Sequence, residues 1–158
     1  MNKRTVMNAE NRKKINSTPS IALSKRNGLI TLGILLLIDT IFDVLRGTQG
    51  NPLFKSIENA FGIWIFPLLV PIALVFFYIA VKLLGQLVEK IDRTPYSEEI
   101  LLMALVIIFV VHDIWVFSVD YMGFRLIRSY YQMIPIYIAV GMAYALWAQH
   151  IMKNKASQ

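Results

Sequence analysis

The sequence predicts an all-α polytopic membrane protein, a bundle of four transmembrane helices with both chain ends on the cytoplasmic side. Hydrophobic residues make up 56% of the 158 residues, and only 16% are charged. A soluble domain is usually about 45–50% apolar and about 25% charged. Only helices and closed barrels can span a bilayer, because every backbone N–H and C=O needs an internal partner there. The apolar runs are too long for barrel strands of about ten residues, so helices are expected.

Four apolar runs define the predicted spans. They cover residues 28–46, 61–88, 97–119 and 130–152, which together form one transmembrane domain over 28–152. At about 1.5 Å per residue the first run measures about 28 Å, close to the thickness of the hydrocarbon layer. A turn and a short interfacial helix over 52–60 are expected between the first two spans, since Gly, Asn and Pro cluster there.

Lys and Arg set the expected orientation. Residues 1–27 carry seven of them and few apolar side chains, so we expect a largely disordered cytoplasmic tail. With the N-terminus inside, twelve Lys and Arg fall on the inner side and four on the outer side. Positive charge concentrates on the cytoplasmic side. The sequence therefore predicts a multi-pass protein of the plasma membrane, N-in and C-in, with residues 153–158 as a second short cytoplasmic tail.

The composition argues against several kinds of chemistry. Without cysteine there are no disulfides, thiolate metal sites or iron–sulfur clusters. A bis-histidine haem is disfavoured, because His112 and His150 differ in depth by roughly 18 Å. No serine-hydrolase, zinc-protease or phosphate-loop motif occurs. The sequence leaves the question of enzyme activity open but favours a protein that is not an enzyme. It disfavours haem and an iron–sulfur cluster, predicts no nucleic-acid partner, and leaves the identity of any cofactor open.

Ionisable residues inside the spans are the strongest functional signal. Each costs about 2.5–3.5 kcal/mol at the centre of a membrane helix on insertion scales. Asp39 and Asp43 share a face of the first helix with Arg46. His112 and Asp113 interrupt the third apolar run. These four, Asp39, Asp43, His112 and Asp113, are the predicted binding residues.

Two of these acids are predicted at the same depth in the membrane. Asp39 precedes Arg46 by seven residues and Asp113 precedes Asp120 by seven, so each lies roughly 10 Å below the outer end of its helix. Prolines 67 and 71 share this layer and are expected to free the carbonyls of residues 63 and 67. The predicted supporting residues are Arg46, Asn51, Asp120, Arg125 and Arg128.

Two interpretations of this layer remain open. In the structural one, Asp43 pairs with Arg46, while Arg125 or Arg128 neutralises Asp113 or Asp39. In the functional one, the layer binds a cation, a proton, a small amine or the polar head of a lipid. A metal ion would find suitable ligand types. However, His112 and Asp113 are adjacent and point about 100° apart on a helix, so both need not face one site.

One segment resembles a known family. Asp39, Gly47 and then Gly50-Asn51-Pro52-Leu53 at the start of the next helix resemble a prokaryotic four-helix membrane family that is classed as a domain of unknown function. The resemblance covers roughly residues 29–85. Gly50 stands where that family has an acid before Asn-Pro. The resemblance implies a membrane helix bundle and no activity.

Three functions follow as hypotheses. The first is a small binding or transport protein with an acidic site in the outer half of the membrane. The alternative is a non-catalytic accessory subunit of a larger membrane complex. A third is a lipid-modifying enzyme that uses the Asp39 and Asp43 spacing with Mg²⁺, although a second aspartate-rich motif is missing. The expected partners are the lipid bilayer and either a second copy of the chain or a larger complex.

Overall fold

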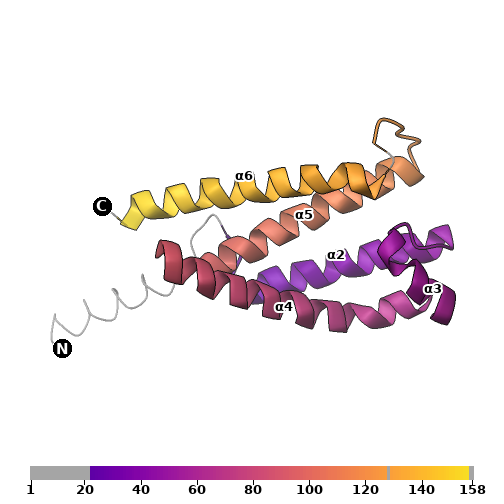
Figure 1. Cartoon of the computed structure of the whole chain (residues 1–158), viewed down its shortest axis with the longest axis horizontal. Coiled ribbons are helices and arrows are strands. Elements are labelled where there is room, and N and C mark those ends of the chain that lie inside the picture. The colour runs from indigo at the N-terminus through magenta and orange to yellow at the C-terminus, as the bar shows by residue number, and fades with distance from the viewer. Residues whose placement is uncertain (1–21, 128, 157–158) are drawn as a thin grey trace, which may run out of the picture.

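The computed structural model describes residues 22–127 and 129–156, and this part of the chain is helical with no strand. Its elements are α2 (Lys25–Arg46), the 3-10 helix η1 (Pro52–Phe54), α3 (Lys55–Phe61), α4 (Ile65–Asp92), α5 (Ser97–Asp120) and α6 (Tyr130–Ala156). The four long helices α2, α4, α5 and α6 are each long and apolar enough to cross a membrane. They run alternately from one end of the molecule to the other, so α2 and α5 point the same way (Figure 1). The predicted all-α class is confirmed, while the N-in, C-in orientation stays a prediction.

The first long helix begins earlier than the sequence predicts. The Ser24 side chain accepts a hydrogen bond from the Asn27 N–H at 3.4 Å, which caps α2 at Lys25. Residues 25–27, expected in the disordered tail, therefore form the first turn of α2. Residues 1–21 of that expected tail lie outside the described residues. At the other chain end, α6 continues to Ala156, through most of the segment expected as the second tail.

The second long helix begins later than expected, at Ile65 and not at residue 61. Gly62 ends α3 with a φ of 78°, and its N–H bonds to the Glu58 carbonyl. Pro67 then falls in the first turn of α4, where a missing N–H costs no helical hydrogen bond. The expected free carbonyl of Ile63 in fact accepts from the Phe66 N–H at 3.3 Å, so that expectation is wrong. Pro71 alone lies inside α4.

Three helices form the main core, and the fourth is attached to one of them. The principal cluster of buried side chains comes from α2, α4 and α5: Leu32, Leu36, Val70, Leu102 and Val106. Within the described chain, α6 makes its extensive contact with α5. A Cβ on Gly141 would lie 2.7 Å from the Ile108 side chain, so α6 approaches α5 closely there. Small residues permit such close approach between membrane helices.

The outward faces of the long helices are strongly apolar. Large side chains are exposed along α4 and α6, among them Leu68, Ile72, Phe76, Ile138 and Leu146. Between 11% and 39% of the most apolar stretch of each long helix is buried inside the molecule. Apolar patches of this extent are rare on soluble monomers and suit contact with lipid. The molecule therefore has the surface expected of a multi-pass membrane protein.

Candidate functional site

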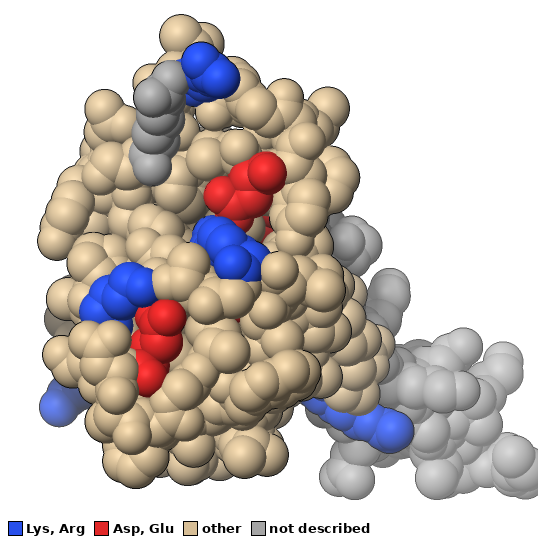
Figure 2. Space-filling view, turned by 90° about the vertical axis from the view of Figure 1, so that its right-hand side faces the viewer, with Lys and Arg blue, Asp and Glu red and all other residues tan. Residues whose placement is uncertain are grey.

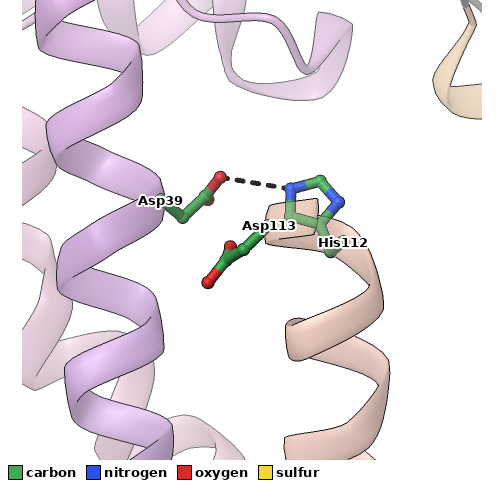
Figure 3. A group of neighbouring side chains, drawn as sticks. All are labelled: Asp39, His112 and Asp113. Atoms are coloured by element: carbon green, nitrogen blue, oxygen red, sulfur yellow. Dashed lines mark hydrogen bonds and ion pairs between the residues drawn. The ribbon is translucent and has the colours of Figure 1, made fainter. Parts of the chain in front are cut away.

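Asp39, His112 and Asp113 meet between α2 and α5. Each offers one possible ligand atom, and these three atoms lie within 4.8 Å of one another. The two carboxylates point from opposite helices into the space between them, with the His112 ring beside them (Figure 3). The parallel course of α2 and α5 brings residues of equal depth together. Although His112 and Asp113 are adjacent, both reach the α2-facing side of α5.

His112 is held on both ring nitrogens. Its Nε2 lies 3.1 Å from Asp39 Oδ1, and its Nδ1 lies 2.7 Å from the hydroxyl oxygen of Tyr137 on α6. A neutral imidazole has one N–H donor and one acceptor nitrogen. Two proton arrangements are therefore consistent with these contacts: Tyr137 donates to Nδ1 while Nε2–H donates to Asp39, or Nδ1–H donates to Tyr137 and leaves Nε2 as an electron-pair donor.

Asp113 is the most unusual of the three residues. Only 7% of its surface is exposed. Among the described residues, neither carboxylate oxygen has a hydrogen-bond partner. A buried polar group without a partner costs about 1–3 kcal/mol, and more when it is charged. Native proteins leave few such groups, and a bound ion, water or proton is a usual reason for one.

A separate ion-pair cluster lies nearer the outer end of α2. Arg46 contacts the Asp43 carboxylate along the helix and Asp120 Oδ2 at 2.5 Å across to α5. Its Nε also donates to the Thr48 carbonyl at 3.0 Å. Asp43, which is 2% exposed, therefore has an arginine partner, as the structural interpretation predicts. Asp43, which was expected in the binding set, is not one of the three grouped donors Asp39, His112 and Asp113, although it lines the same cavity as Asp39 and His112.

Of the remaining predicted supporting residues, Asn51 and Arg125 lie in loops at the same end of the bundle as Arg46. Asn51 caps η1, because its side-chain oxygen accepts from the Leu53 N–H at 3.0 Å. Arg125 is exposed on the loop between α5 and α6, so it does not fold inward onto Asp113. Arg128 lies outside the described residues. Arg46, Asn51, Asp120 and Arg125 therefore lie at or near the end of the bundle where α2 and α5 end, and no arginine hydrogen-bonds to Asp113 among the described residues.

Charges at the outer end are largely paired. Glu58 accepts hydrogen bonds from Lys55 Nζ at 2.8 Å and from the Gln49 N–H at 3.0 Å. These bonds, Lys55 first, lower the pKa of Glu58 from its ordinary value. Figure 2 faces this end and shows acidic side chains next to basic ones on a mostly uncharged surface. No strongly charged docking surface is therefore visible on this end.

Aromatic side chains surround His112, and they include a residue that the sequence analysis missed. The ring centroids of Trp115, Tyr130 and Tyr137 lie 5.9, 5.6 and 5.6 Å from that of His112. Among the described residues, Tyr137 is the one of these three whose side chain also forms a hydrogen bond with His112. It follows the start of α6 by seven residues, which is the depth of Asp39 and Asp113 on their own helices. Its position at the same depth as Asp39 and Asp113 is the feature of the sequence that could have indicated Tyr137 as a site residue.

A cavity of about 730 Å³ adjoins the cluster. Its walls come from α2, α4, α5, α6 and the segment 49–54, and most of them are apolar or aromatic. Asp39, His112 and Tyr137 lie at its surface, whereas Asp113 lies behind them and does not line it. Sites of this kind, an apolar cavity with a few converging polar groups, are the usual form of small-molecule sites.

Comparison of the chain with protein-family models, with curated proteins and with solved structures gave no match. The resemblance of residues 29–85 to a prokaryotic membrane family therefore stays a prediction.

Proposed function

We propose that this chain is a small membrane-embedded cation-binding protein whose site is formed by Asp39, His112 and Asp113. The observation that carries the proposal is the buried Asp113 carboxylate, which has no hydrogen-bond partner among the described residues. Two carboxylates and one imidazole carry a net negative charge when both carboxylates are ionised, even if the imidazole is protonated. A cation in their midst would compensate that charge, as buried charges require.

The position of the basic residues supports a ligand as the source of this compensation. Arg46 is engaged by Asp43 and Asp120. Lys55 is engaged by Glu58, and Arg125 is exposed on the outer loop. Within the cluster, the Asp39 carboxylate lies 3.1 Å from His112 Nε2. Intramembrane ionisable residues without a structural partner commonly mark ion or substrate sites.

The cavity supports the same proposal by giving the cluster an approach. Asp39 and His112 are at its surface, and Gln49 and Asn51 line it toward the outer loop. A cation from the outer side would pass these amide side chains before it reaches the carboxylates. The apolar remainder of the wall excludes competing water, which strengthens the attraction between a cation and the carboxylates.

A binding experiment on the purified chain tests the proposal. The thermal midpoint would be measured in detergent with Na⁺, Ca²⁺, Zn²⁺, Co²⁺ and a primary amine, each added alone. At least one cation should raise the midpoint of the wild type, since a ligand that binds the folded state stabilises it. Asp113→Asn should abolish the rise, while Asp120→Asn, a matched loss of an acid outside the cluster, should retain it. An unchanged midpoint with every cation would overturn the proposal.

Transport is tested separately. In liposomes, flux of the cation that stabilises the protein should fall in Asp39→Asn and in Asp113→Asn. Equal flux in both variants and the wild type would mean that the protein binds the cation at the cluster but does not transport it through the cluster. A large protein complex that co-purifies in mild detergent, with no cation effect on the chain, would support an accessory subunit in place of the proposed function.

A further inference from the structure

We infer that the cation is a divalent transition metal ion of the Zn²⁺, Co²⁺ or Mn²⁺ class, bound by Asp39, His112 and Asp113 and positioned by Tyr137. The inference rests on the proposed function and names its ligand. An acidic pair alone would not support it. The Asp113 side chain adds an independent observation, because it is more than nine-tenths buried and has no described hydrogen-bond partner. Its carboxylate lies near the other two donor atoms.

The donor set favours this class of ion. One imidazole nitrogen and two carboxylate oxygens form a mixed nitrogen–oxygen set, and imidazole suits zinc and its first-row neighbours. Ca²⁺ takes about six to eight oxygen ligands, and Mg²⁺ prefers an oxygen octahedron that keeps several waters. Neither preference is met by three donors of which one is nitrogen. An ammonium group in the cavity would reach Asp39 but not Asp113, because Asp113 does not line the cavity.

The distances are close to those of a bound site. Zinc binds imidazole nitrogen at about 2.0–2.1 Å and carboxylate oxygen at about 2.0–2.2 Å, so two donors on one ion lie at most about 4.4 Å apart. The three donor atoms already lie within 4.8 Å of one another. Small rotations of the Asp39 and Asp113 side chains would bring them into range without movement of α2 or α5.

Tyr137 gives His112 the orientation that a metal ligand needs. Metal-bound histidines usually donate their second ring N–H to another group, which fixes the tautomer. When Nδ1–H donates to the Tyr137 oxygen, 2.7 Å away, Nε2 becomes the electron-pair donor. Nε2 then faces the Asp39 oxygen at 3.1 Å, so these two electron-pair donors are close enough to bind one metal ion. Tyr137 is therefore a positioning residue.

Three protein ligands leave a coordination position for a further group. Zinc sites that bind substrate commonly have three protein ligands and a water in the fourth position. Here Asp39 and His112 lie at the surface of the cavity, beside the Tyr137 hydroxyl. A water or the polar end of an apolar molecule in the cavity is the expected fourth ligand.

Co²⁺ titration of the purified full-length chain tests the inference. Co²⁺ reports its ligands in its visible spectrum, and calorimetry gives the stoichiometry. The wild type should bind one Co²⁺ per chain, Zn²⁺ should displace it, and the spectrum should be that of a nitrogen–oxygen site. His112→Gln and Asp113→Asn should abolish this binding. His150→Gln, which removes the only other histidine, is the matched control and should bind Co²⁺ as the wild type does.

The variant of Tyr137 separates a positioning role from a structural one. Tyr137→Phe keeps the ring and removes the hydroxyl. It should fold with the wild-type thermal midpoint in the absence of metal and weaken Co²⁺ binding by about 10–100-fold, the usual effect of losing a partner of a metal-bound histidine. Unchanged affinity in Tyr137→Phe would remove the positioning role.

The inference and the proposed function can fail separately. If Co²⁺ and Zn²⁺ do not bind while Na⁺, Ca²⁺ or an amine stabilises the wild type but not Asp113→Asn, the inference is wrong and the proposed function stands. If Co²⁺ binds equally to the wild type and His112→Gln, the metal lies elsewhere and the inference is also wrong. If no cation of any class binds at the cluster, both are wrong.

Discussion

Asp113 is the residue on which the proposed cation site depends. It is buried on α5, it has no hydrogen-bond donor among the described residues, and Asp39 faces it from α2. A buried carboxylate without a partner costs free energy. The proposed cation would offset this cost.

Replacement of Asp113 should raise the stability of the metal-free protein and abolish its cation binding. Asp113→Asn removes the charge and keeps the shape, and the amide NH₂ that it introduces can donate to the nearby Asp39 carboxylate. The metal-free protein should therefore gain stability by about 1–3 kcal/mol, the usual cost of a buried unsatisfied group. SDS-induced unfolding would measure the gain. The same variant should lose the cation-dependent part of its stability. A variant less stable than the wild type in the absence of cations would show that Asp113 has a structural partner.

Arg46 should matter for stability and not for binding. Asp43 is almost fully buried against it, and removal of one partner of a buried ion pair costs about 3–5 kcal/mol. Arg46→Met should therefore destabilise the protein by about 3 kcal/mol, the lower end of that range, because Arg46 is partly exposed. The double variant with Asp43→Asn should recover part of the loss. Equal losses in the single and double variants would contradict the pairing.

At the scale of the helices, close contacts fix how α4 meets α5. A Cβ on Gly85 of α4 would lie 2.9 Å from the Glu98 Cα, which is a backbone atom and has little room to move. Gly85→Ala should therefore destabilise the protein by about 1–3 kcal/mol, the usual cost of overpacking. Thermal or SDS unfolding would measure this loss.

Gly33→Ala is the matched control for this experiment. Its added Cβ would meet Leu74 at 3.6 Å, an ordinary contact. Alanine in a helix interior is about 0.5–1 kcal/mol more favourable than glycine, so this variant should be neutral or slightly stabilised. Equal losses in both variants would show that glycine acts through the helix backbone and not through the contact between α4 and α5.

The elements show which parts of the fold were predictable. Four apolar runs predicted four long helices, because a helix is the one way such a run can satisfy its backbone in lipid. The start of α4 was not predictable, since it depends on the positive φ of Gly62 after α3. A single glycine in the sequence does not reveal which conformation it adopts. Pro67 consequently moved from an expected helix interior to a first turn.

The sequence predicted the depth of the candidate site but not which side chains contact one another there. Counting residues from the outer helix ends placed Asp39 and Asp113 at one level, and the structure brings them together. The inclusion of His112 depended on the rotation of α5, which the core packing decides. Tyr137 was missed because its contact with His112 depends on how α6 aligns along α5, and neither helix encodes that alignment alone.

At the scale of the whole molecule, the orientation in the membrane can be tested cleanly, because the chain has no cysteine. Single cysteines at exposed Leu53 and Met122, both at the outer end in the predicted orientation, should react with an impermeant thiol reagent on intact cells. Exposed Ile91 at the other end should react only after permeabilisation. The labelling is read on a gel by a shift in mass. The reverse pattern would contradict N-in and C-in.

The way α6 is attached has a consequence for entry into the cavity. Among the described residues, α6 makes its extensive contact with α5 and not with α4, although both α4 and α6 line the cavity. If the bundle spans a membrane as proposed, an apolar molecule dissolved in the bilayer would reach the cavity between these two helices, with its polar end toward His112, and need not cross the lipid headgroups.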